Sequence, residues 1–326
     1  MISVLRCCWV LAILVAAIPR AEAQRTTYPD RPIRLVVAFS PGGATDVFAR
    51  QIVENLKEAL GQPVIVDNRP GAGGSIAWQH IAAAEPDGYT LLLAENALAM
   101  AQGFARGGGF DPVKQFDAIA HVAASPLVLV VSNKVQANSV AELIAASRSA
   151  GQKISYSSSG VGSVAHLAFE VFKAGAGIDA VHVPYRGGGQ SMGDVVAGHI
   201  EAIMASIAVA KNLIATNQVK GLAVTSAQRS PVLPNLPTLK EAGVTTADVD
   251  LSFWWGIFGP AGMPEAVKTK LDRALAAVMS DPEVRRRLAN LEVEPAYAPG
   301  DVLKAKLAKE ITNWAKFISE HGIKPE

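Results

Sequence analysis

The feature that most constrains the fold is an alternation of short β-branched runs with alanine-rich amphipathic segments. The first part of the chain predicts strands at 33–39, 62–68 and 89–95, and helices at 44–60 and 74–84. A later part repeats the order, with strands at 153–159, 180–185 and 200–207, and helices at 163–175 and 190–199. Strands that alternate with helices predict βαβ units around a mostly parallel sheet flanked by helices.

The repeat indicates two similarly built α/β lobes. The chain has 326 residues, which is more than one ordinary hydrophobic core holds. The apolar run 125–133 suits a strand that crosses into the second lobe, and the aromatic run 250–260 suits the return. We therefore expect lobe 1 to hold residues 24–126 plus 252–326, and lobe 2 to hold 127–251. A single larger doubly wound domain is the alternative.

The first residues have the pattern of a secretory signal peptide. The run CCWVLAILVAAI follows a basic residue, and Ala21-Glu22-Ala23 is a cleavage signal, so we expect residues 1–23 to be removed between Ala23 and Gln24. Twelve apolar residues would span only about 18 Å as a helix, too little for a membrane anchor. The pattern predicts export to the periplasm and no direct membrane insertion.

Export in this way has two chemical consequences. Cys7 and Cys8 are the only cysteines and would leave with the signal peptide, so the mature chain would have no disulfide and no thiol nucleophile. It would also have equal numbers of basic and acidic side chains. A neutral chain has no general electrostatic reason to bind nucleic acid or anionic lipid.

Glycine-rich turns follow four of the expected strands, and each precedes a helix. They contain PGG (41–43), NRPGAGGS (68–75), GVG (160–162) and YRGGGQS (185–191). The first N–H groups of a helix lack intrahelical partners and carry the positive end of the helix dipole. Glycine lets a ligand approach the backbone, so such turns can hold a carboxylate without any lysine or arginine. Ordinary tight turns and helix caps are the alternative.

Several side chains lie beside these turns. The expected ligand-binding residues are Ser40, Gly42, Gly43, Asp46, Gly73, Asn96, Ser159, Gly160, Ser163, His166, Tyr185 and Arg186. Asp46 could pair with an ammonium group, or it could simply cap its helix. Arg186 could bind a second carboxylate, or it could be a solvated arginine.

Catalytic and cofactor motifs find little support. The stretch beginning at Gly160 fits a relaxed dinucleotide pattern, but the next strand does not end in the acidic residue that would hold the ribose. The histidines show no H-E-x-x-H pairing, so we expect no metal and no cofactor. A hydrolase using Ser163 and His166 is conceivable, because such pairs are recognised by geometry. We expect a binding protein and not an enzyme.

The sequence also resembles a known family, the Bug-type solute-binding proteins of tripartite tricarboxylate transporters. The resemblance covers nearly the whole mature chain, in order. It is carried by YPDRPIRLVVAFSPGGATDVFAR, VDNRPGAGGSIA, EPDGYTLLLAE, FDPVKQFDAIAHVA, ISYSSSGVGSVAHLAFE, VHVPYRGGGQSMGDVVAGHIEA and LPTLKEAG. Gln115 departs from the family, which commonly has an acidic residue there.

The resemblance implies a two-lobed periplasmic binding protein of the Venus-flytrap type, similar to type II. Such a receptor closes on a small carboxylate and presents it to the membrane subunits of a transporter, and we expect a monomer. The family implies that Ser40, Gly42, Gly43 and Asp46 face Ser159, Gly160, Ser163 and His166 across the cleft, with Tyr185 nearby. A receptor for a sensor kinase is an alternative that the sequence does not separate from a transport receptor.

Overall fold

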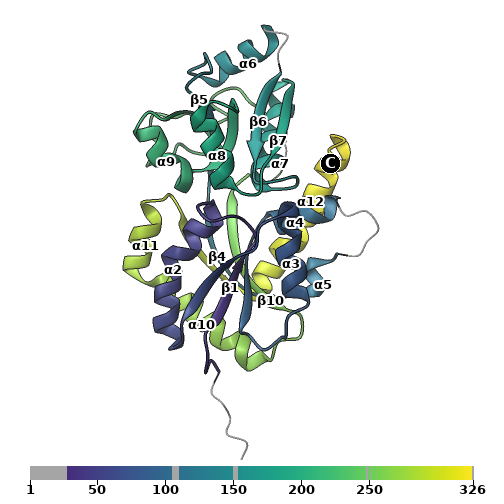
Figure 1. Cartoon of the computed structure of the whole chain (residues 1–326), viewed down its shortest axis with the longest axis vertical. Helices are drawn as coiled ribbons and strands as arrows, with labels where there is room; N and C mark the ends of the chain where they lie inside the picture. The colour runs from purple at the N-terminus through teal and green to yellow at the C-terminus, as the bar shows by residue number, and fades with distance from the viewer. Residues whose placement is uncertain (1–27, 105–109, 150–152, 247–248, 250, 325–326) are drawn as a thin grey trace, which may run out of the picture.

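The computed structural model describes residues 28–104, 110–149, 153–246, 249 and 251–324. Two lobes are stacked along the long axis of the molecule, each built around its own sheet (Figure 1). The expected signal peptide and its cleavage point lie outside the described residues. Within the described part, no helix is long and apolar enough to cross a membrane.

One lobe contains the N-terminal strands, and its sheet has six strands. Their order is β11-β4-β10-β3-β1-β2. The bounds are β1 Ile33–Val37, β2 Val64–Asn68, β3 Thr90–Glu95, β4 Phe116–Ser125, β10 Phe253–Pro260 and β11 Glu294–Pro299. We call this body the first lobe.

The sheet of the second lobe has five strands in the order β7-β6-β8-β5-β9. The bounds are β5 Leu127–Ser132, β6 Ile154–Ser158, β7 Ala180–Pro184, β8 Ala202–Ser206 and β9 Val219–Val224. Every residue of β5 is buried, as its continuous apolar sequence predicts.

Both sheets are mixed, whereas the sequence pattern predicted mostly parallel ones. The expected βαβ strands are parallel: β1 pairs with β2 and β3, and β6 pairs with β7 and β8. However, β5 is antiparallel to both of its neighbours, and so is β10. These two strands start where the chain enters a lobe from the other one, so they run away from the hinge while the βαβ strands run towards it.

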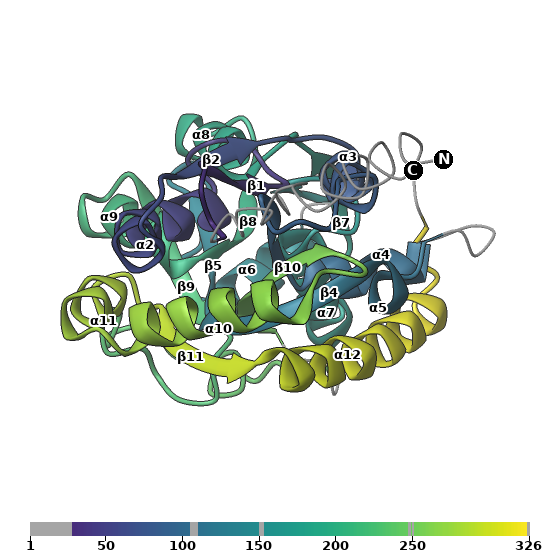
Figure 2. The same ribbon diagram turned by 90° about the horizontal axis from the view of Figure 1, so that it is seen from below.

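Helices cover both sheets (Figures 1 and 2). Those of the first lobe are α2 Ala44–Leu60, α3 Ser75–Ala82, α4 Ala97–Phe104, α5 Pro112–Gln115, α10 Glu265–Ser280, α11 Pro282–Ala289 and α12 Gly300–Glu320, with a short 3₁₀ helix at Ala72–Gly74. Those of the second lobe are α6 Val140–Ser149, α7 Val164–Ala176, α8 Gly188–Ala197 and α9 Ile207–Ala215. Figure 2 shows α11 beside α2, and α12 running along β4 and α4.

The sequences of the C-terminal helices explain where α11 begins and how α12 packs. Asp281 caps α11 by accepting hydrogen bonds from the backbone N–H groups of Glu283 and Val284, with Pro282 at the first helical position. Helix α12 buries a stripe of apolar residues at helical spacing against β4 and α4. The buried members of the stripe are Leu303, Leu307, Trp314 and Ile318.

Two fully buried tryptophans on β10 connect the hinge to the first lobe. The indole of Trp254 donates a hydrogen bond of 2.7 Å to Glu310 on α12. The ring of Trp255 stacks on Phe48 of α2 with centroids 4.7 Å apart. Its Nε1 donates to Thr45 Oγ1 at 3.1 Å, which fixes the first turn of α2 against the sheet.

Substitutions at two helix glycines, Gly175 and Gly193, test the packing of the second lobe. An alanine Cβ at Gly175, in the last turn of α7, would overlap the carbonyl oxygen of Thr245. We expect Gly175→Ala to lower the free energy of unfolding by about 1–3 kcal/mol, because backbone must move to make room. The measurement is urea unfolding followed by circular dichroism.

The matched control is Gly193→Ala in α8, where an added Cβ meets no atom within 4 Å. This substitution should raise stability by about 0.5–1 kcal/mol, through helix propensity alone. Equal effects of the two substitutions would contradict the packing described for α7.

Candidate functional site

A small, partly open cavity of about 40 Å³ lies between the two lobes. We call it the inner cavity. Both lobes contribute to its wall, and several apolar side chains line it. The lining residues are Phe39, Gly43, Ala44, Thr45, Glu95 and Phe253 of the first lobe, and Ser159, Ala165, Gly188, Met192, Ile203, Met204, Ala205, Ser206 and Val209 of the second.

Four helices begin at the inner cavity. Ala44 starts α2 and Gly188 starts α8, and both residues line the wall. Ala165 lies in the first turn of α7, while Ser206 is the residue at which α9 begins. A helix N-terminus carries unpaired N–H groups and roughly half a positive charge, so each of the four favours an anion nearby.

Glu95 is the single ionisable side chain of this wall among the described residues. It ends β3 and is 4 % exposed. Thr45 donates a hydrogen bond to its Oε2, and the indole of Trp255 donates in turn to Thr45. Burial raises the pKa of Glu95 to about 8, and the Thr45 bond opposes this only in part.

A second polar group of the wall has no partner. The hydroxyl of Ser206 is buried and makes no hydrogen bond to any described residue. An unsatisfied buried hydroxyl costs about 1–3 kcal/mol, so such groups usually serve a ligand or ordered water. Ser206 belongs to the second lobe and Glu95 to the first, so a molecule between them would contact both lobes.

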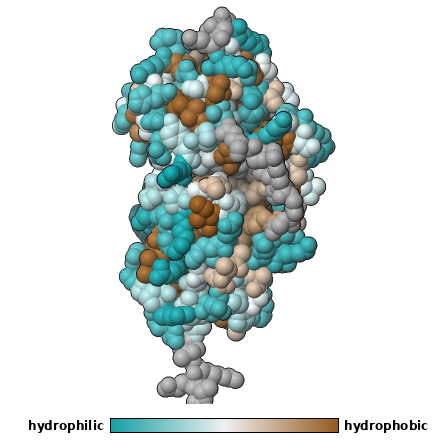
Figure 3. Space-filling model, turned by 45° about the vertical axis from the view of Figure 1, so that its right-hand side comes forward, coloured by the Kyte–Doolittle hydropathy of each residue, from teal (hydrophilic) through white to brown (hydrophobic). Residues whose placement is uncertain are grey.

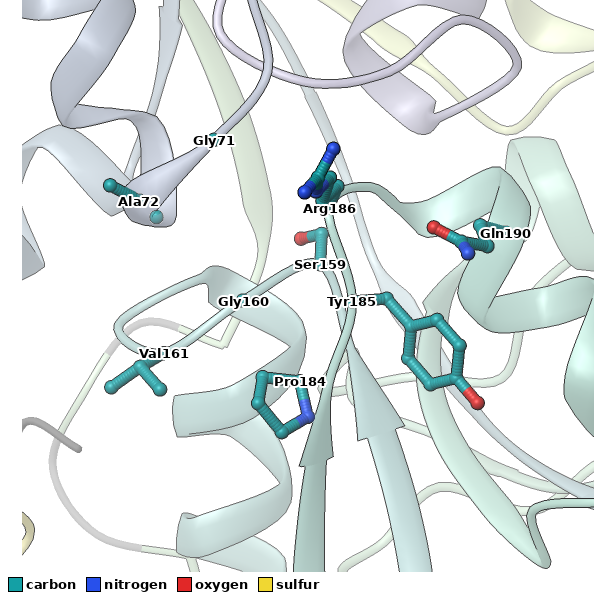
Figure 4. A pocket seen from close by; sticks show the side chains of 10 residues that line it. Gly71, Ala72, Ser159, Gly160, Val161, Pro184, Tyr185, Arg186 and Gln190 are labelled. Carbon is teal, nitrogen blue, oxygen red and sulfur yellow. The ribbon is translucent and has the colours of Figure 1, made fainter.

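A wider cavity of about 860 Å³ opens beside the inner one, also between the lobes. We call it the outer cavity. Its lining residues are Gly71, Ala72, Gly73, Ser159, Gly160, Val161, Pro184, Tyr185, Arg186 and Gln190. Figure 4 shows Arg186 and Ser159 together near its centre, between the Gly71–Ala72 turn and Gln190. Ser159 lines both cavities, so the two adjoin at this residue.

Half of the expected site residues line these cavities, and the others line neither: Ser40, Gly42, Asp46, Asn96, Ser163 and His166. Gly43 and Ser159 line the inner cavity. The outer cavity is lined by Gly73, Ser159, Gly160, Tyr185 and Arg186. The ring of Tyr185 points away from the Gly71–Ala72 turn (Figure 4), and its hydroxyl donates to Asp194. This contact and burial raise the pKa of Tyr185 to about 12.

The glycine turns do face one another, but not in the expected pairs. The PGG turn (41–43) lies against the YRGGG turn: the hydroxyl of Ser40 donates to the carbonyl of Arg186 at 3.3 Å. The GVG turn (160–162) instead meets the PGAGG turn, where an added Cβ on Gly73 would overlap the Val161 carbonyl. The direct contacts thus join PGG to YRGGG and GVG to PGAGG, while Gly43 and Ser159 still line the inner cavity from opposite lobes.

Asp46 is occupied within its own helix. Its carboxylate pairs with Arg50 at 2.9 Å and accepts the N–H of Gly42 at 2.9 Å. Although burial opposes ionisation, these bonds hold the pKa of Asp46 below its usual range. The side chain lines neither cavity. It shapes the PGG turn, and the interpretation of Asp46 as an ammonium partner does not fit this position.

Asn96 and Ser163 are buried in structural contacts. The amide of Asn96 donates to the carbonyl of Ser252 at 2.8 Å, just before β10. The hydroxyl of Ser163 accepts the backbone N–H of His166 and so caps α7. The Nδ1 of His166 accepts the backbone N–H of Gly162 at 3.1 Å.

His166 belongs to a stacked pair at the edge of the second lobe. Its ring lies 4.0 Å from that of His182, whose Nε2 is 2.6 Å from Ser158 Oγ. A pocket beside these rings is also lined by His321, Ile323 and Lys324, so the end of α12 reaches the second lobe there. Among the described residues, no group of three His, Cys, Asp or Glu could hold a metal ion.

Sequence reasoning missed Thr45, Glu95 and Ser206. Glu95 directly follows an apolar run, at the carboxyl end of an expected strand, which is where ligands bind in α/β sheets. That position was the available signal. Ser206 also ends a strand and precedes a helix, but the sequence placed the strand end one residue later, at 207.

The contact between the lobes can be tested at Gly187. An alanine Cβ there would stand 2.6 Å from Ser40 Cβ and 2.8 Å from Ser40 N, across the interface. The backbone of Gly187 is extended, so alanine causes no local strain. We expect Gly187→Ala to favour opening of the lobes, measured as a larger radius of gyration in small-angle X-ray scattering.

The control is the neighbouring Gly188→Ala, whose Cβ would lie 3.8 Å from Gly43 Cα, an ordinary contact. Its radius of gyration should match that of the unmodified protein. Identical scattering from Gly187→Ala and the unmodified protein would mean that the lobes do not meet at Ser40 in solution.

The stacked histidines predict a loss of stability in acid. Burial, followed by the charge of Lys173, lowers the pKa of His166 to about 4. Burial, followed by the charge of His166 and then that of Lys173, lowers the pKa of His182 to about 3. The unfolded chain binds these protons near pH 6.5. Stability is therefore complete above that pH and falls below it, by up to about 1.4 kcal/mol per pH unit and histidine, until the folded pKa is reached.

Urea unfolding between pH 7.5 and 4 measures this slope. His182→Gln should reduce it, because a neutral amide replaces a group that only the unfolded chain protonates. His199→Gln, at an exposed position, should leave it unchanged. An unaltered slope in His182→Gln would refute the assignment.

Comparison with known proteins identifies relatives along the whole chain. The sequence profile of the family described as tripartite tricarboxylate transporter family receptor matches residues 48–323. The protein BugT of Bordetella pertussis is 32 % identical over 306 residues, 93 % of each chain.

Solved structures agree with this. A periplasmic binding protein, BugD, superposes with a TM-score of 0.87 at 31 % identity, covering 92 % of this chain and 100 % of BugD. Rpa4515 of R. palustris, solved with adipate, superposes with a TM-score of 0.87 at 32 % identity and the same coverage. The two-lobed fold is thus shared with periplasmic solute-binding proteins, and the chain belongs to the Bug-type receptors of the tripartite tricarboxylate transporter family.

Proposed function

We propose that the protein captures a small organic carboxylate between its lobes and delivers it to the membrane subunits of a transporter. The observation that carries the proposal is the meeting of four helix N-termini, from α2, α7, α8 and α9, at one small cavity between the lobes. Each N-terminus stabilises a nearby anion by about 0.3–1 kcal/mol, and more where it is partly buried.

The inner cavity favours an anion held by backbone groups. Within the described residues, no lysine or arginine lines it. The carboxylate would bind main-chain N–H groups, which recognise the carboxylate itself and little else of the ligand. The volume of about 40 Å³ suits one polar end of a ligand, so the rest would extend past Ser159 into the outer cavity.

Arg186 offers a contact for that second end. It is exposed and lines the outer cavity near Ser159 (Figure 4). A guanidinium forms paired hydrogen bonds with a carboxylate. The relative Rpa4515, solved with adipate, supports a dicarboxylate as one class of ligand to test.

Lobe closure would couple binding to delivery. We assign residues 24–126 plus 252–326 to the first lobe and 127–251 to the second, because β4 leads into β5 through Pro126 alone and β10 provides the return. Rotation at these crossings would bury the ligand and form the surface that membrane subunits recognise. Removal of residues 1–23 during export would place the receptor in the periplasm.

The hydrolase alternative finds no support in the geometry. The hydroxyl of Ser163 is buried and accepts the backbone N–H of His166, and His166 uses Nδ1 to accept the N–H of Gly162. Neither residue lines the inner cavity. A receptor role therefore explains the site better than nucleophilic catalysis.

Thermal unfolding against a panel of mono-, di- and tricarboxylates tests the proposal. The protein, as residues 24–326, is first unfolded and refolded to remove bound ligand. A true ligand at a hundred times its Kd should stabilise by about 2.7 kcal/mol, a rise in Tm of a few degrees. No shift with any carboxylate, after refolding has been confirmed, would overturn the proposal.

A substitution that fills the space between the lobes tests where the ligand binds. A Cβ on Gly43 would stand 3.8 Å from Gly188 N of the other lobe, so the side chain of Gly43→Leu would fill the gap between the lobes. We expect this variant to lose the ligand-induced shift. Gly193→Leu, with open space around its Cβ on α8, should keep it.

A further inference from the structure

The acid in the wall of the inner cavity, Glu95, has one carboxylate oxygen without a hydrogen-bond partner among the described residues. Thr45 donates to Glu95 Oε2, and no described residue makes a hydrogen bond to the other oxygen, Oε1. The Ser206 hydroxyl, 5 % exposed, lines the same wall and also lacks a partner. Each lobe thus presents to the inner cavity one polar group without a hydrogen-bond partner in the described part of the chain.

This acid is unlike the other buried carboxylates of the chain. Asp46 is paired with Arg50, and Glu310 binds Lys306 and the Trp254 indole. Glu95 has only a hydroxyl as its partner, and no cation of the described chain contributes to its charge state. A buried carboxylate without a cation is costly, so it is a place that a ligand cation can stabilise.

We infer that Glu95 and Ser206 form the subsite for a positively charged amino group, so that the receptor selects small amino-carboxylates over the corresponding acids without nitrogen. The inference rests on the proposed function and specifies its ligand class. The ligand carboxylate would take the helix N-termini, and its ammonium group would donate to Glu95 Oε1 and Ser206 Oγ.

Charge balance favours an ammonium group over a second carboxylate next to Glu95. The helix N-termini favour the negative end of a ligand, whereas Glu95 in its ionised form attracts an ammonium group and repels another anion at close range. In a zwitterionic ligand the carboxylate lies beside the helix N-termini and the ammonium group lies beside Glu95. The inner cavity, at about 40 Å³, has room for the adjoining carboxylate and ammonium groups of an amino acid but not for a large side group, which would extend past Ser159 into the outer cavity.

Ligand binding should then displace a proton. The groups that face Glu95 and the cavity are Thr45 of α2, Trp255 and Phe253 of β10, Met192 of α8 and Ser206, and none of them ionises near neutral pH. Because burial raises the pKa of Glu95 to about 8, the empty site carries a proton at pH 7. An ammonium group binds the ionised form, so that proton must leave.

The test compares matched ligands by calorimetry: L-aspartate with succinate, L-glutamate with glutarate, and L-alanine with propionate. At pH 8.5 the amino member of at least one pair should bind ten-fold or more tightly than its partner. Its affinity should fall about ten-fold per pH unit below pH 8, the dependence expected for release of one proton. Succinate-type ligands should show no such slope.

Variants assign the effect to Glu95. Glu95→Gln keeps the shape of the side chain and should abolish both the amino preference and the pH slope. Ser206→Ala removes the second acceptor and should weaken the amino ligand several-fold while keeping the slope. Glu310→Gln replaces another buried glutamate beside a tryptophan and should retain both properties, and thermal unfolding of each variant verifies its fold.

The outcomes separate the two ideas. The amino subsite is overturned if the nitrogen-free acids bind as tightly as their amino partners or more tightly. It is also overturned if the affinity of the amino ligand rises as the pH falls. Either result leaves a carboxylate receptor in place. A preference that survives in Glu95→Gln also overturns it. Binding of no member of either series overturns the subsite, and the proposed function falls with it only if the full carboxylate panel also gives no shift in Tm.

Discussion

The direction of the chain at the hinge is the constraint on which the rest of the structure depends. β4 passes into β5 through Pro126 alone, and β10 returns to the first lobe. The βαβ strands of both sheets consequently end at the hinge side, and the helices that follow them begin there. Four helix N-termini therefore meet between the lobes without any cationic side chain among the described residues of the inner wall.

Trp255 connects the hinge strand β10 to the inner cavity through its contacts. Its ring packs on Phe48, its indole binds Thr45, and Thr45 binds Glu95. The hinge strand, the first turn of α2 and the buried acid are thus joined by consecutive contacts. On the face shown in Figure 3, hydrophilic residues predominate and the strongly hydrophobic areas are separate from one another. Specific recognition is concentrated inside, where burial strengthens each polar contact.

Local pattern predicted most elements, and long-range geometry decided the rest. Helix α2 matches its expected range because its apolar period and the glycines at both ends agree. The mixed sheets were not predictable from alternation, since strand direction depends on where the chain enters each lobe. The direct contacts between the turns were not predictable for the same reason, because they depend on how the two lobes meet. Asp46 was misinterpreted because Arg50, one turn later, already neutralises it. Glu95 was overlooked because it ends an apolar run.

The reach of α12 has a practical consequence. The last described residues after this helix, Ile323 and Lys324, line a pocket together with His166 and His182 of the other lobe. The C-terminus of the first lobe is therefore beside a part that moves on closure. A fluorophore attached at this seam would change its surroundings whenever the lobes rotate. The receptor is thereby suited to conversion into an optical sensor for its own solute, with no second label needed.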